Sequence, residues 1–340
     1  MTLREKLEAE ECRRVAPHAA RSCESRGRLR PESEHEYRTA FQRDRDRILH
    51  TKAFRRLKRK TQVFLAPEGD HYRTRLTHTL EAAQIARTAA RALFLNEDLA
   101  EAVALGHDLG HTPFGHAGEV VLDEVYAPGF RHAEQSLRVV DKLEPGRDGF
   151  GLNLTFEVRD GILNHSKGKN ILLRRRAERP ATLEAELVSV CDAIAYVNHD
   201  IDDAIRAGVI TLSDLPRDAI RVLGPTPSAR IDAMVTALIE GCREGEIGMT
   251  PEIRDATNAL RTFMYESVYS CEAVTREIDK AKKLFREMYM HLLEHPSPES
   301  AAGSPEDPLD RRTVDFLAGM TDPYALSLYQ RLFFPVAWNA

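Results

Sequence analysis

Long apolar runs are missing from this sequence. Nowhere do about eighteen apolar residues follow one another, which is the least that a membrane-spanning helix needs. The first ten residues, MTLREKLEAE, are charged and contain no apolar stretch of the kind found in a secretion signal. We therefore expect no membrane partner and a cytoplasmic location.

Cysteine is also scarce. The 340 residues contain five cysteines, and no two of them form a CxxC pair. This spacing argues against a disulfide framework and against a zinc knuckle. We expect reduced thiols that are mostly buried.

Alternating runs of valine and isoleucine, which would indicate strands, are equally rare, whereas apolar residues recur at spacings of three and four. The pattern predicts an all-α fold, and 42% hydrophobic residues suffice for a sizeable core. One helix should begin after Asn96 as N-cap and run to His107. The glycines and the proline that follow predict an irregular segment carrying His111 and His116.

A second helix should begin after Thr182 and end at Gly208. It has an apolar stripe made of Leu187, Val190, Ile194, Val197 and Ile201. Asp192, Tyr196 and Asp200 are spaced four residues apart and therefore share a different face of the same helix. We expect these three polar groups to line one surface.

The strongest local charge lies between Arg38 and Gln62, where ten lysines and arginines stand against two aspartates. Such a segment can bind phosphate groups, but a solvated basic helix face has the same composition. The composition alone leaves both interpretations open.

Titratable side chains crowd the stretch LGHDLGHTPFGHAGE, residues 105–119. His107 and Asp108 can supply two ligands to a divalent cation, although a histidine at a helix end beside an exposed aspartate would look the same. Upstream, Arg75 and His78 are three residues apart on one helical face. Downstream, Asp192 interrupts an apolar stretch, where a carboxylate needs a partner or a metal.

The pattern H…HD…D, made by His78, His107 with Asp108, and Asp192, resembles that of the HD-domain phosphohydrolase superfamily. More narrowly, the chain is similar to the deoxyguanosinetriphosphate triphosphohydrolase family and its bacterial dGTPase-like members. The matching stretches are SRGRLRPE, YRTAFQRDRDRILHTKAFRRLKRKTQVF, YRTRLTHTLEAAQIAR, ALGHDLGHTPFGHAGE, CDAIAYVNHDIDDA and GMTDPYALSLY.

This resemblance implies an all-α HD-domain helical fold with additional C-terminal helices. We expect an N-terminal basic segment at 1–60, the HD core at 61–210, and a helical region at 211–340 with an exposed Pro/Ser-rich connection at 295–308. The implied reaction cleaves a deoxynucleoside triphosphate between the 5′ oxygen and the α-phosphorus, releasing deoxynucleoside and inorganic triphosphate. The implied cofactor is a divalent metal, one of Mn, Mg, Fe, Co, Ni or Zn.

The resemblance also implies roles for single residues. The metal ligands would be His78, His107, Asp108 and Asp192, and the catalytic pair would be His116 with Glu119. The residues that contact substrate would be Gln62, Arg75, His111, His132, Tyr196 and Asp200. Without the resemblance, His132 could be a surface histidine and Tyr196 a core aromatic. His165 could be structural or close to phosphate.

One position departs from a known relative: the eukaryotic SAM-and-HD-domain triphosphohydrolase has a lysine directly after its last metal aspartate, and this chain has Ala193. We expect the basic residues 43–60 and the stretch 167–170 to neutralise phosphate instead.

Two other functions remain alternatives. One is HD-type hydrolysis of a monophosphate, cyclic or hyperphosphorylated nucleotide, and the other is a nucleic-acid-binding regulator with an HD fold. The expected partners are the deoxynucleoside triphosphate, further copies of the chain in a homo-oligomer, and single-stranded nucleic acid bound weakly.

Overall fold

The computed structural model describes residues 1–62, 73–147, 149–166, 179–243, 245–304 and 306–335. Within these ranges the secondary structure is almost entirely helical. The strands found there are β1 (Pro145–Gly146) and β2 (Gly149–Phe150), which pair antiparallel with Pro145 opposite Phe150. The prediction of an all-α fold is therefore confirmed.

The helices of the first half are α1 (Leu3–Arg14), α2 (Ala40–Leu49), α3 (Lys52–Arg56), α4 (Arg75–Ala92), α5 (Glu97–Gly106), α6 (His116–Val125), α7 (His132–Arg138) and α8 (Phe156–Asn164). Those of the second half are α9 (Leu183–Arg206), α10 (Arg217–Leu223), α11 (Pro227–Gly241), α12 (Pro251–Phe263), α13 (Glu272–Glu294), α14 (Leu309–Ala318) and α15 (Asp322–Phe333). Short 3₁₀ segments are η1 (Ser22–Glu24), η2 (Leu57–Arg59) and η6 (Leu212–Asp214), and π-helical segments are η3 (Val139–Leu143) and η7 (Met264–Tyr269).

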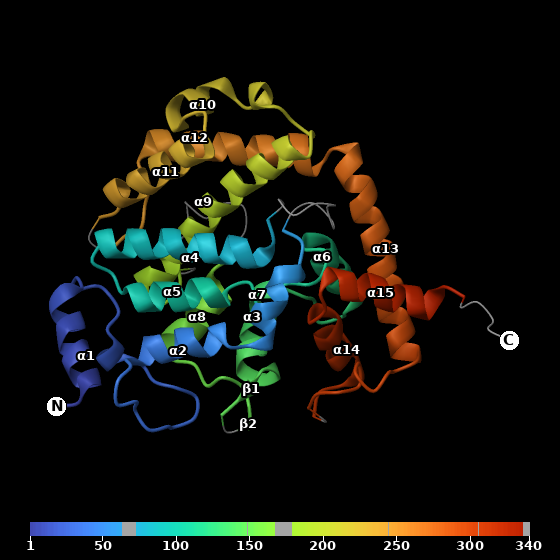
Figure 1. Ribbon diagram of the computed structural model, residues 1–340, viewed down its shortest axis with the longest axis horizontal. Helices are drawn as coiled ribbons and strands as arrows, with labels where there is room; N and C mark the ends of the chain where they lie inside the picture. The colour runs from blue at the N-terminus through green and yellow to red at the C-terminus, as the bar shows by residue number, and fades with distance from the viewer. Residues whose placement is uncertain (63–72, 148, 167–178, 244, 305, 336–340) are drawn as a thin grey trace.

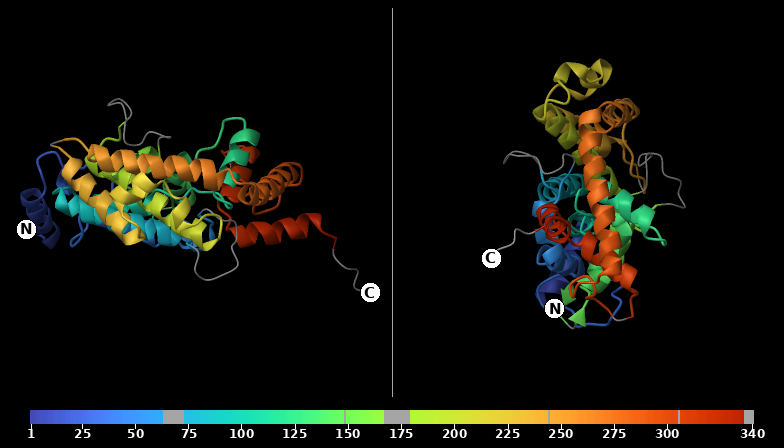
Figure 2. Two further views of the ribbon diagram at one scale, coloured as in Figure 1. Left: turned by 90° about the horizontal axis from the view of Figure 1, so that it is seen from above. Right: turned by 90° about the vertical axis from the view of Figure 1, so that its right-hand side faces the viewer.

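Three helices form the centre of the molecule: α4 packs against both α5 and α9. On one side α2 covers α5, and on the other α11 packs on α9 and, with α10 and α12, forms the upper layer in Figure 1. Helix α13 descends from that layer and contacts α6, α14 and α15. Figure 2 shows α1 and α15 at opposite ends of an elongated molecule.

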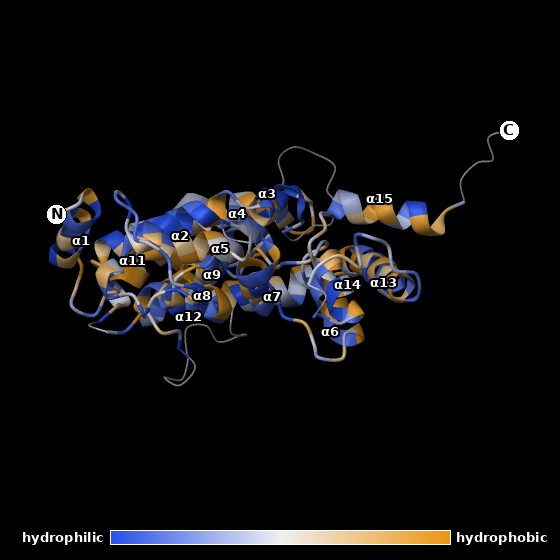
Figure 3. Ribbon diagram, turned by 90° about the horizontal axis from the view of Figure 1, so that it is seen from below, coloured by the Kyte–Doolittle hydropathy of each residue, from blue (hydrophilic) through white to orange (hydrophobic). Residues whose placement is uncertain are grey.

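The apolar faces of these helices meet in two clusters, a large one around α4, α5 and α9 and a smaller one among α6, α13, α14 and α15. Figure 3 shows the alternation of hydrophilic and hydrophobic residues along the helices that produces such faces. The predicted stripe on α9 is buried throughout, from Leu187 to Ile201. Among the described helices none combines the length and apolar character that crossing a membrane would require.

The two helices predicted from their caps form as expected. The side-chain oxygen of Asn96 accepts a hydrogen bond from the Leu99 N–H at 3.1 Å, and α5 ends at His107. The hydroxyl of Thr182 caps α9 in the same way, and Gly208 adopts a positive φ of 69° just after this helix ends.

The cysteine prediction is partly wrong. The described thiols are free, as expected, but only Cys191 is buried. Cys12 and Cys23 are far more accessible, and their sulfur atoms lie 3.4 Å apart because η1 folds back against α1. Sequence separation did not indicate this proximity, since it depends on where the chain reverses after α1.

The Pro/Ser-rich stretch 295–308 connects α13 to α14, and its described residues, 295–304 and 306–308, form no helix. Most of its described residues are exposed or half-buried, whereas Ser300 is fully buried and bonds to the backbone of Ser297.

Candidate active site

A cavity of about 920 Å³ opens between α4, α9 and the segment from α12 to η7. Its size lies within the range of about 300–1,000 Å³ that is usual for small-molecule sites. Nine of the twelve residues predicted for the site line this cavity: Gln62, Arg75, His78, Asp108, His111, His116, His132, Asp192 and Tyr196. His107, Glu119 and Asp200 lie immediately behind its wall, in contact with lining residues.

The four residues predicted to bind metal come together from α4, α9 and the turn that follows α5. His78 Nε2 lies 2.9 Å from Asp192 Oδ1, and His107 Nε2 lies 3.5 Å from the same oxygen. Asp108 Oδ1 is 3.3 Å from His107 Nε2. His78, His107 and Asp192 each offer one ligand atom within 4.8 Å of the others. Two imidazoles and carboxylates form the mixed nitrogen and oxygen donor set that suits a borderline divalent cation.

The hydrogen bonds of His107 fix which nitrogen is free for a metal. Its Nδ1 lies 2.6 Å from the carbonyl oxygen of Ala104, and a carbonyl only accepts, so Nδ1 carries the proton. Nε2 is buried, has no hydrogen-bond partner in the part of the chain that the structure describes, and points toward the carboxylates. A buried nitrogen lone pair beside two carboxylates fits a cation at this place.

The electrostatics lead to the same conclusion. Burial opposes a positive charge on His107, but Asp108 and Asp192 nevertheless raise its pKa to about 9. The pKa of Asp192 is held well below its usual range, against the effect of burial, by the adjacent imidazoles of His107 and His78. The cluster therefore favours positive charge at its centre, and a divalent cation would supply it.

A second group, made of Asp108, His111 and His132, also brings three ligand atoms together. The two imidazoles are stacked, with centroids 4.0 Å apart and planes inclined by only 14°. Ring lone pairs lie in the ring planes, so two nearly parallel rings do not direct them at a common ion. We therefore place no metal there. Burial lowers the pKa of His111 well below its usual range, so this ring is neutral.

His116 and Glu119 face each other across the first turn of α6. His116 is the first residue of that helix rather than part of the irregular segment, and its side chain is 75% exposed toward the cavity mouth. Its Nδ1 lies 3.3 Å from Glu119 Oε2, while Glu119 Oε1 accepts from His132 Nδ1 at 2.8 Å. Burial would raise the pKa of Glu119, but these two histidines hold it well below its usual range.

Both nitrogens of His132 are engaged, since Nε2 lies 3.1 Å from His165 Nε2. His165 is buried, and its Nδ1 donates to the carbonyl of Ile162, so its Nε2 accepts from His132. Burial lowers the pKa of His165 to about 3. A phosphate can bond to His132 only by replacing one of these two contacts.

Asp200 lies on α9, one turn beyond Tyr196, and has no exposed surface. The hydroxyl of Tyr269, from η7, donates to Asp200 Oδ2, while Oδ1 has no hydrogen-bond partner in the described part of the chain. Burial raises the pKa of Asp200 to about 8. The rings of Tyr196 and Tyr269 lie 6.2 Å apart at the cavity wall.

Gln62 borders the cavity as the last described residue before residue 73, and its Oε1 is buried with no hydrogen-bond partner among the described residues. Its backbone carbonyl approaches Gly115, where an added Cβ would lie 3.5 Å from that oxygen and 3.3 Å from Arg75 Nη2. Gly115 has a φ of 56°, so the turn before His116 needs glycine for its conformation.

The expectation that residues 43–60 neutralise phosphate is wrong for the cations of α2. Arg43 and Arg47 pair with Glu32, and Arg45 pairs with Asp98, so the charges of α2 are neutralised within the fold. None of these arginines lines the cavity. Residues 167–170 lie outside the described residues.

Three further residues line the cavity from α12 and η7 and were not predicted from the sequence: Arg261, Tyr265 and Tyr269. Arg261 is a second guanidinium in the cavity lining, in addition to Arg75, and forms no ion pair with a described carboxylate. These residues are spaced four apart, which was the available signal, since that spacing places them on one helical face. The π-helical geometry of η7 was not predictable from the sequence, and such segments are frequent at functional sites.

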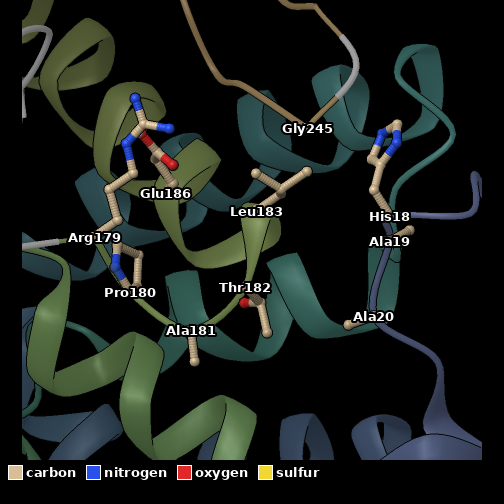
Figure 4. A pocket seen from close by; sticks show the side chains of 10 residues that line it. All are labelled: His18, Ala19, Ala20, Arg179, Pro180, Ala181, Thr182, Leu183, Glu186 and Gly245. Carbon is tan, nitrogen blue, oxygen red and sulfur yellow. The ribbon is translucent and has the colours of Figure 1, made fainter. Parts of the chain in front are cut away.

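A smaller hollow of about 360 Å³ lies at the start of α9, between Thr182 and His18 (Figure 4). Its charged groups, Arg179 and Glu186, lie 3.4 Å apart and pair with each other. The groups of possible metal ligands found in the described residues lie elsewhere, so the larger cavity is the candidate site.

Comparison with known proteins adds independent findings. The family model "HD domain" matches residues 75–197, and the model "Phosphohydrolase-associated domain" matches residues 247–331. The predicted division at residues 60 and 210 stays a prediction.

Two similar relatives are both called deoxyguanosinetriphosphate triphosphohydrolase-like proteins. The protein of Caldanaerobacter subterraneus subsp. tengcongensis is 53% identical over 99% of this chain and 98% of its own length. That of Desulfatibacillum aliphaticivorans is 50% identical over 98% and 99%. Among solved structures, a phosphohydrolase of Bacteroides thetaiotaomicron matches with a TM-score of 0.54 at 18% identity, covering 84% of this chain and 67% of that one, which shows the shared fold.

Proposed function

The chain belongs to the deoxyguanosinetriphosphate triphosphohydrolase-like family of HD-domain phosphohydrolases, and from this premise we propose that it is a metal-dependent deoxynucleoside triphosphate triphosphohydrolase. The proposed reaction adds water to a deoxynucleoside triphosphate, breaks the bond between the 5′ oxygen and the α-phosphorus, and releases deoxynucleoside and inorganic triphosphate. We propose His78, His107, Asp108 and Asp192 as the ligands of the metal.

One observation carries the proposal: a cluster of two imidazoles and a carboxylate, with Asp108 beside it, faces the same cavity as a histidine paired with a carboxylate. A divalent cation there would polarise a phosphate oxygen and acidify water, whose pKa can fall from about 15.7 to about 7. The remaining chemistry is left to the side chains around it.

His116 is the residue that we assign to proton transfer. Its exposed Nε2 can protonate the leaving 5′ oxygen, while Glu119 holds Nδ1 and stabilises the imidazolium form. The neutral His111 and the guanidinium of Arg75 would bind phosphate oxygens on the inner side of the cavity. Arg261 would add positive charge from α12 and would replace the charge of the lysine that the relative has at the position of Ala193.

The sugar would lie against Tyr196. A ring packed on C2′ leaves no room for a 2′ hydroxyl, which favours deoxynucleotides. The unpartnered Oδ1 of Asp200 would bond the 3′ hydroxyl, and Tyr269 holds the other oxygen of this carboxyl group in place. Gln62, with its unpartnered Oε1, would contact base or sugar.

The test is to incubate the purified protein with each of the four deoxynucleoside triphosphates and Mn²⁺, Mg²⁺ or Co²⁺, and to identify the products by ion-exchange chromatography. Deoxynucleoside and triphosphate in equal amounts are expected. Nucleoside monophosphate with pyrophosphate, or diphosphate with orthophosphate, would place the attack at another phosphorus and overturn the proposal. Cyclic, monophosphate and hyperphosphorylated nucleotides serve as rival substrates in the same assay.

Two partner predictions extend this proposal. The homo-oligomer is tested by light scattering on the eluting peak of a size-exclusion column, where a mass near 38.4 kDa would contradict it. Weak binding of single-stranded nucleic acid is tested by fluorescence anisotropy at two salt concentrations, because phosphate contacts weaken as salt rises.

A further inference from the structure

Two charged side chains lie buried directly behind the cavity wall, outside the set assigned to chemistry. Lys60 is 3% exposed, and its ammonium group donates to the carbonyl oxygen of His111 and, at 2.9 Å, to that of Ala318. Ala318 is the last residue of α14, so the cation also lies at the negative end of that helix. Lys60 thereby joins the histidine-rich segment to the C-terminal helices.

Asp322, the first residue of α15, makes the matching connection with its carboxylate. Its Oδ1 accepts from the Phe114 N–H at 3.0 Å, and its Oδ2 accepts from both the N–H (2.9 Å) and the hydroxyl of Thr61. The side chain is 3% exposed, and its bonds reach residues 208 and 261 positions away in the sequence. It belongs to GMTDPYALSLY, a family stretch to which the proposed chemistry assigns no role.

These contacts hold the backbone on both sides of the cavity wall. Phe114 adopts a φ of 62°, a conformation that costs energy in a residue with a side chain, and it stands two positions before His116. Thr61 directly precedes Gln62 and bridges to Thr74, the N-cap of α4, which begins with Arg75. Asp322 therefore positions two stretches of chain that carry proposed substrate contacts.

The two charges do not pair directly, since no ion pair within 4.0 Å joins them in the described chain. Burial lowers the pKa of Lys60 to about 7, and burial raises the pKa of Asp322 against its hydrogen bonds. Both groups are costly to bury, and their observed hydrogen bonds go to backbone or hydroxyl groups of residues 61, 111 and 114 beside the site and, for Lys60, also to the end of α14. A connection that served packing alone could be made by apolar side chains at lower cost.

We propose that Lys60 and Asp322 are positioning residues, which clamp the segment from His111 to His116 and the segment carrying Gln62 onto the start of α15. The inference rests on the proposed function for its kinetic consequence, and it predicts a structural consequence that needs no substrate. In the clamped state the proton-transfer histidine and the phosphate contacts keep their distances to the metal ligands.

The test compares Lys60→Met and Asp322→Asn with the control Asp315→Asn. Methionine keeps length but donates nothing, and the asparagine amide turns an N–H group toward one of the N–H donors that the carboxylate accepted from. Asp315 lies in the same helix as Ala318 and binds Arg138 of α7 at 2.9 Å, so its loss weakens the same contact between C-terminal helices and core without touching residues 111–116.

The first readout is hydrogen–deuterium exchange of peptides covering residues 109–119 in the full-length protein, measured together with thermal stability and bound metal. In both clamp variants we expect the amides of residues 109–119 to exchange at least about tenfold faster than in the wild type. In Asp315→Asn we expect no change in the exchange of these amides, when it is compared with a clamp variant of equal thermal stability. Metal content should stay at the wild-type level. Unchanged exchange in both clamp variants, or equal acceleration in the control, would overturn the proposal whether or not the protein hydrolyses nucleotides.

The second readout separates this proposal from the proposed function. If the wild-type protein releases triphosphate, the clamp variants should lose about 10–100-fold in kcat, because a misplacement of about 1 Å at a reacting group costs that much. KM should change less than kcat. A fall in kcat that merely matches the fall in Asp315→Asn would show a purely structural role. If the wild-type protein releases no triphosphate, the proposed function fails, and the exchange experiment still decides the clamp.

Discussion

His199 Nδ1 lies 3.3 Å from His78 Nδ1, on the side of the His78 ring that faces away from Asp192. His199 Nε2 in turn lies 2.5 Å from Glu81 Oε2, and a carboxylate this close favours a proton on that nitrogen. Burial lowers the pKa of His199, so the ring is neutral and its Nδ1 accepts from His78. His78 Nε2 faces Asp192 Oδ1 at 2.9 Å, and a metal bound between these two atoms would replace the proton that they share, while Nδ1 keeps its own proton.

This relay predicts that Glu81→Ala weakens metal binding by about 10–100-fold, as is usual for residues that orient a ligand histidine. The measurement is a competition titration with a fluorescent chelator, which needs no substrate. Glu101→Ala is the matched control, because that carboxylate pairs with Arg45 and Arg87 away from the cavity. Equal affinities in the two variants would show that Glu81 has no part in orienting His78.

Asp108→Ala should lose both the metal and the turnover. Alanine offers no donor atom, and the substitution also leaves Arg75, 2.9 Å from Asp108 Oδ2, buried without its carboxylate. Metal per chain is measured by plasma mass spectrometry after dialysis, and the exposed Asp232→Ala serves as control. Stoichiometric metal together with normal activity would remove Asp108 from the ligand set.

The sequence was sufficient to predict features that depend on residues close to one another in the chain. The cap at Asn96 and the four-residue spacing of Asp192, Tyr196 and Asp200 depend on the chain within a few turns, and the structure has both. The hydrogen-bond partner of Asp200 could not be predicted from neighbouring residues. Tyr269 follows 69 residues later, and its direction depends on the π-helical turn of η7.

The carboxylates that pair with the basic residues 38–62 could not be predicted either, because they are distant in the sequence. The basic composition of residues 38–62 was interpreted as available for phosphate, but Arg45 meets Asp98 and Glu101 only because α2 packs on α5. Charge counted over a short segment ignores carboxylates that tertiary packing brings from elsewhere. The alternative interpretation, a basic helix face exposed to solvent, also fails for one residue of this segment. Lys60 is buried and bonded to two carbonyls.

The raised pKa of Asp200 predicts a pH dependence of stability. With a folded pKa of about 8 and an ordinary pKa near 3.8, the folded state binds more protons between these values, so Asp200 makes stability fall as pH rises through this window. One proton contributes at most about 1.4 kcal/mol per pH unit. Asp200→Asn should remove this slope in urea unfolding at pH 5, 6 and 7. The exposed Asp232→Asn should keep the wild-type slope, and an unchanged slope in Asp200→Asn would contradict the protonated state.

His116→Ala should keep the metal and lose about 10²–10⁴-fold in rate, the usual range for general acid–base assistance. The ring is exposed, so its removal leaves no buried cavity. Steady-state rates and metal content are measured on the same preparation, with Val120→Ala as a control at another exposed position of α6. Loss of metal along with rate would place His116 among the ligands and end its assignment to proton transfer.

The last prediction concerns Tyr196, whose ring we place against C2′ of the sugar. Tyr196→Ala removes the clash with a 2′ hydroxyl and also the packing on deoxyribose. The kcat/KM for deoxynucleotides should therefore fall while that for ribonucleotides falls less or rises, and the ratio between them should narrow. The ratio is the measured quantity, because absolute rates also respond to any shift of Asp192 on the same helix.

Val190→Ala provides the matched control for that shift. Val190 lies on α9 in the buried apolar stripe, so its truncation disturbs the helix without reaching the sugar. We expect it to slow both substrates equally and to leave the ratio unchanged. If Tyr196→Ala behaves in the same way, Tyr196 belongs to the core, and the choice between deoxyribose and ribose is made by other residues of the cavity, with Tyr269 the first to be tested because its ring lies 6.2 Å from that of Tyr196.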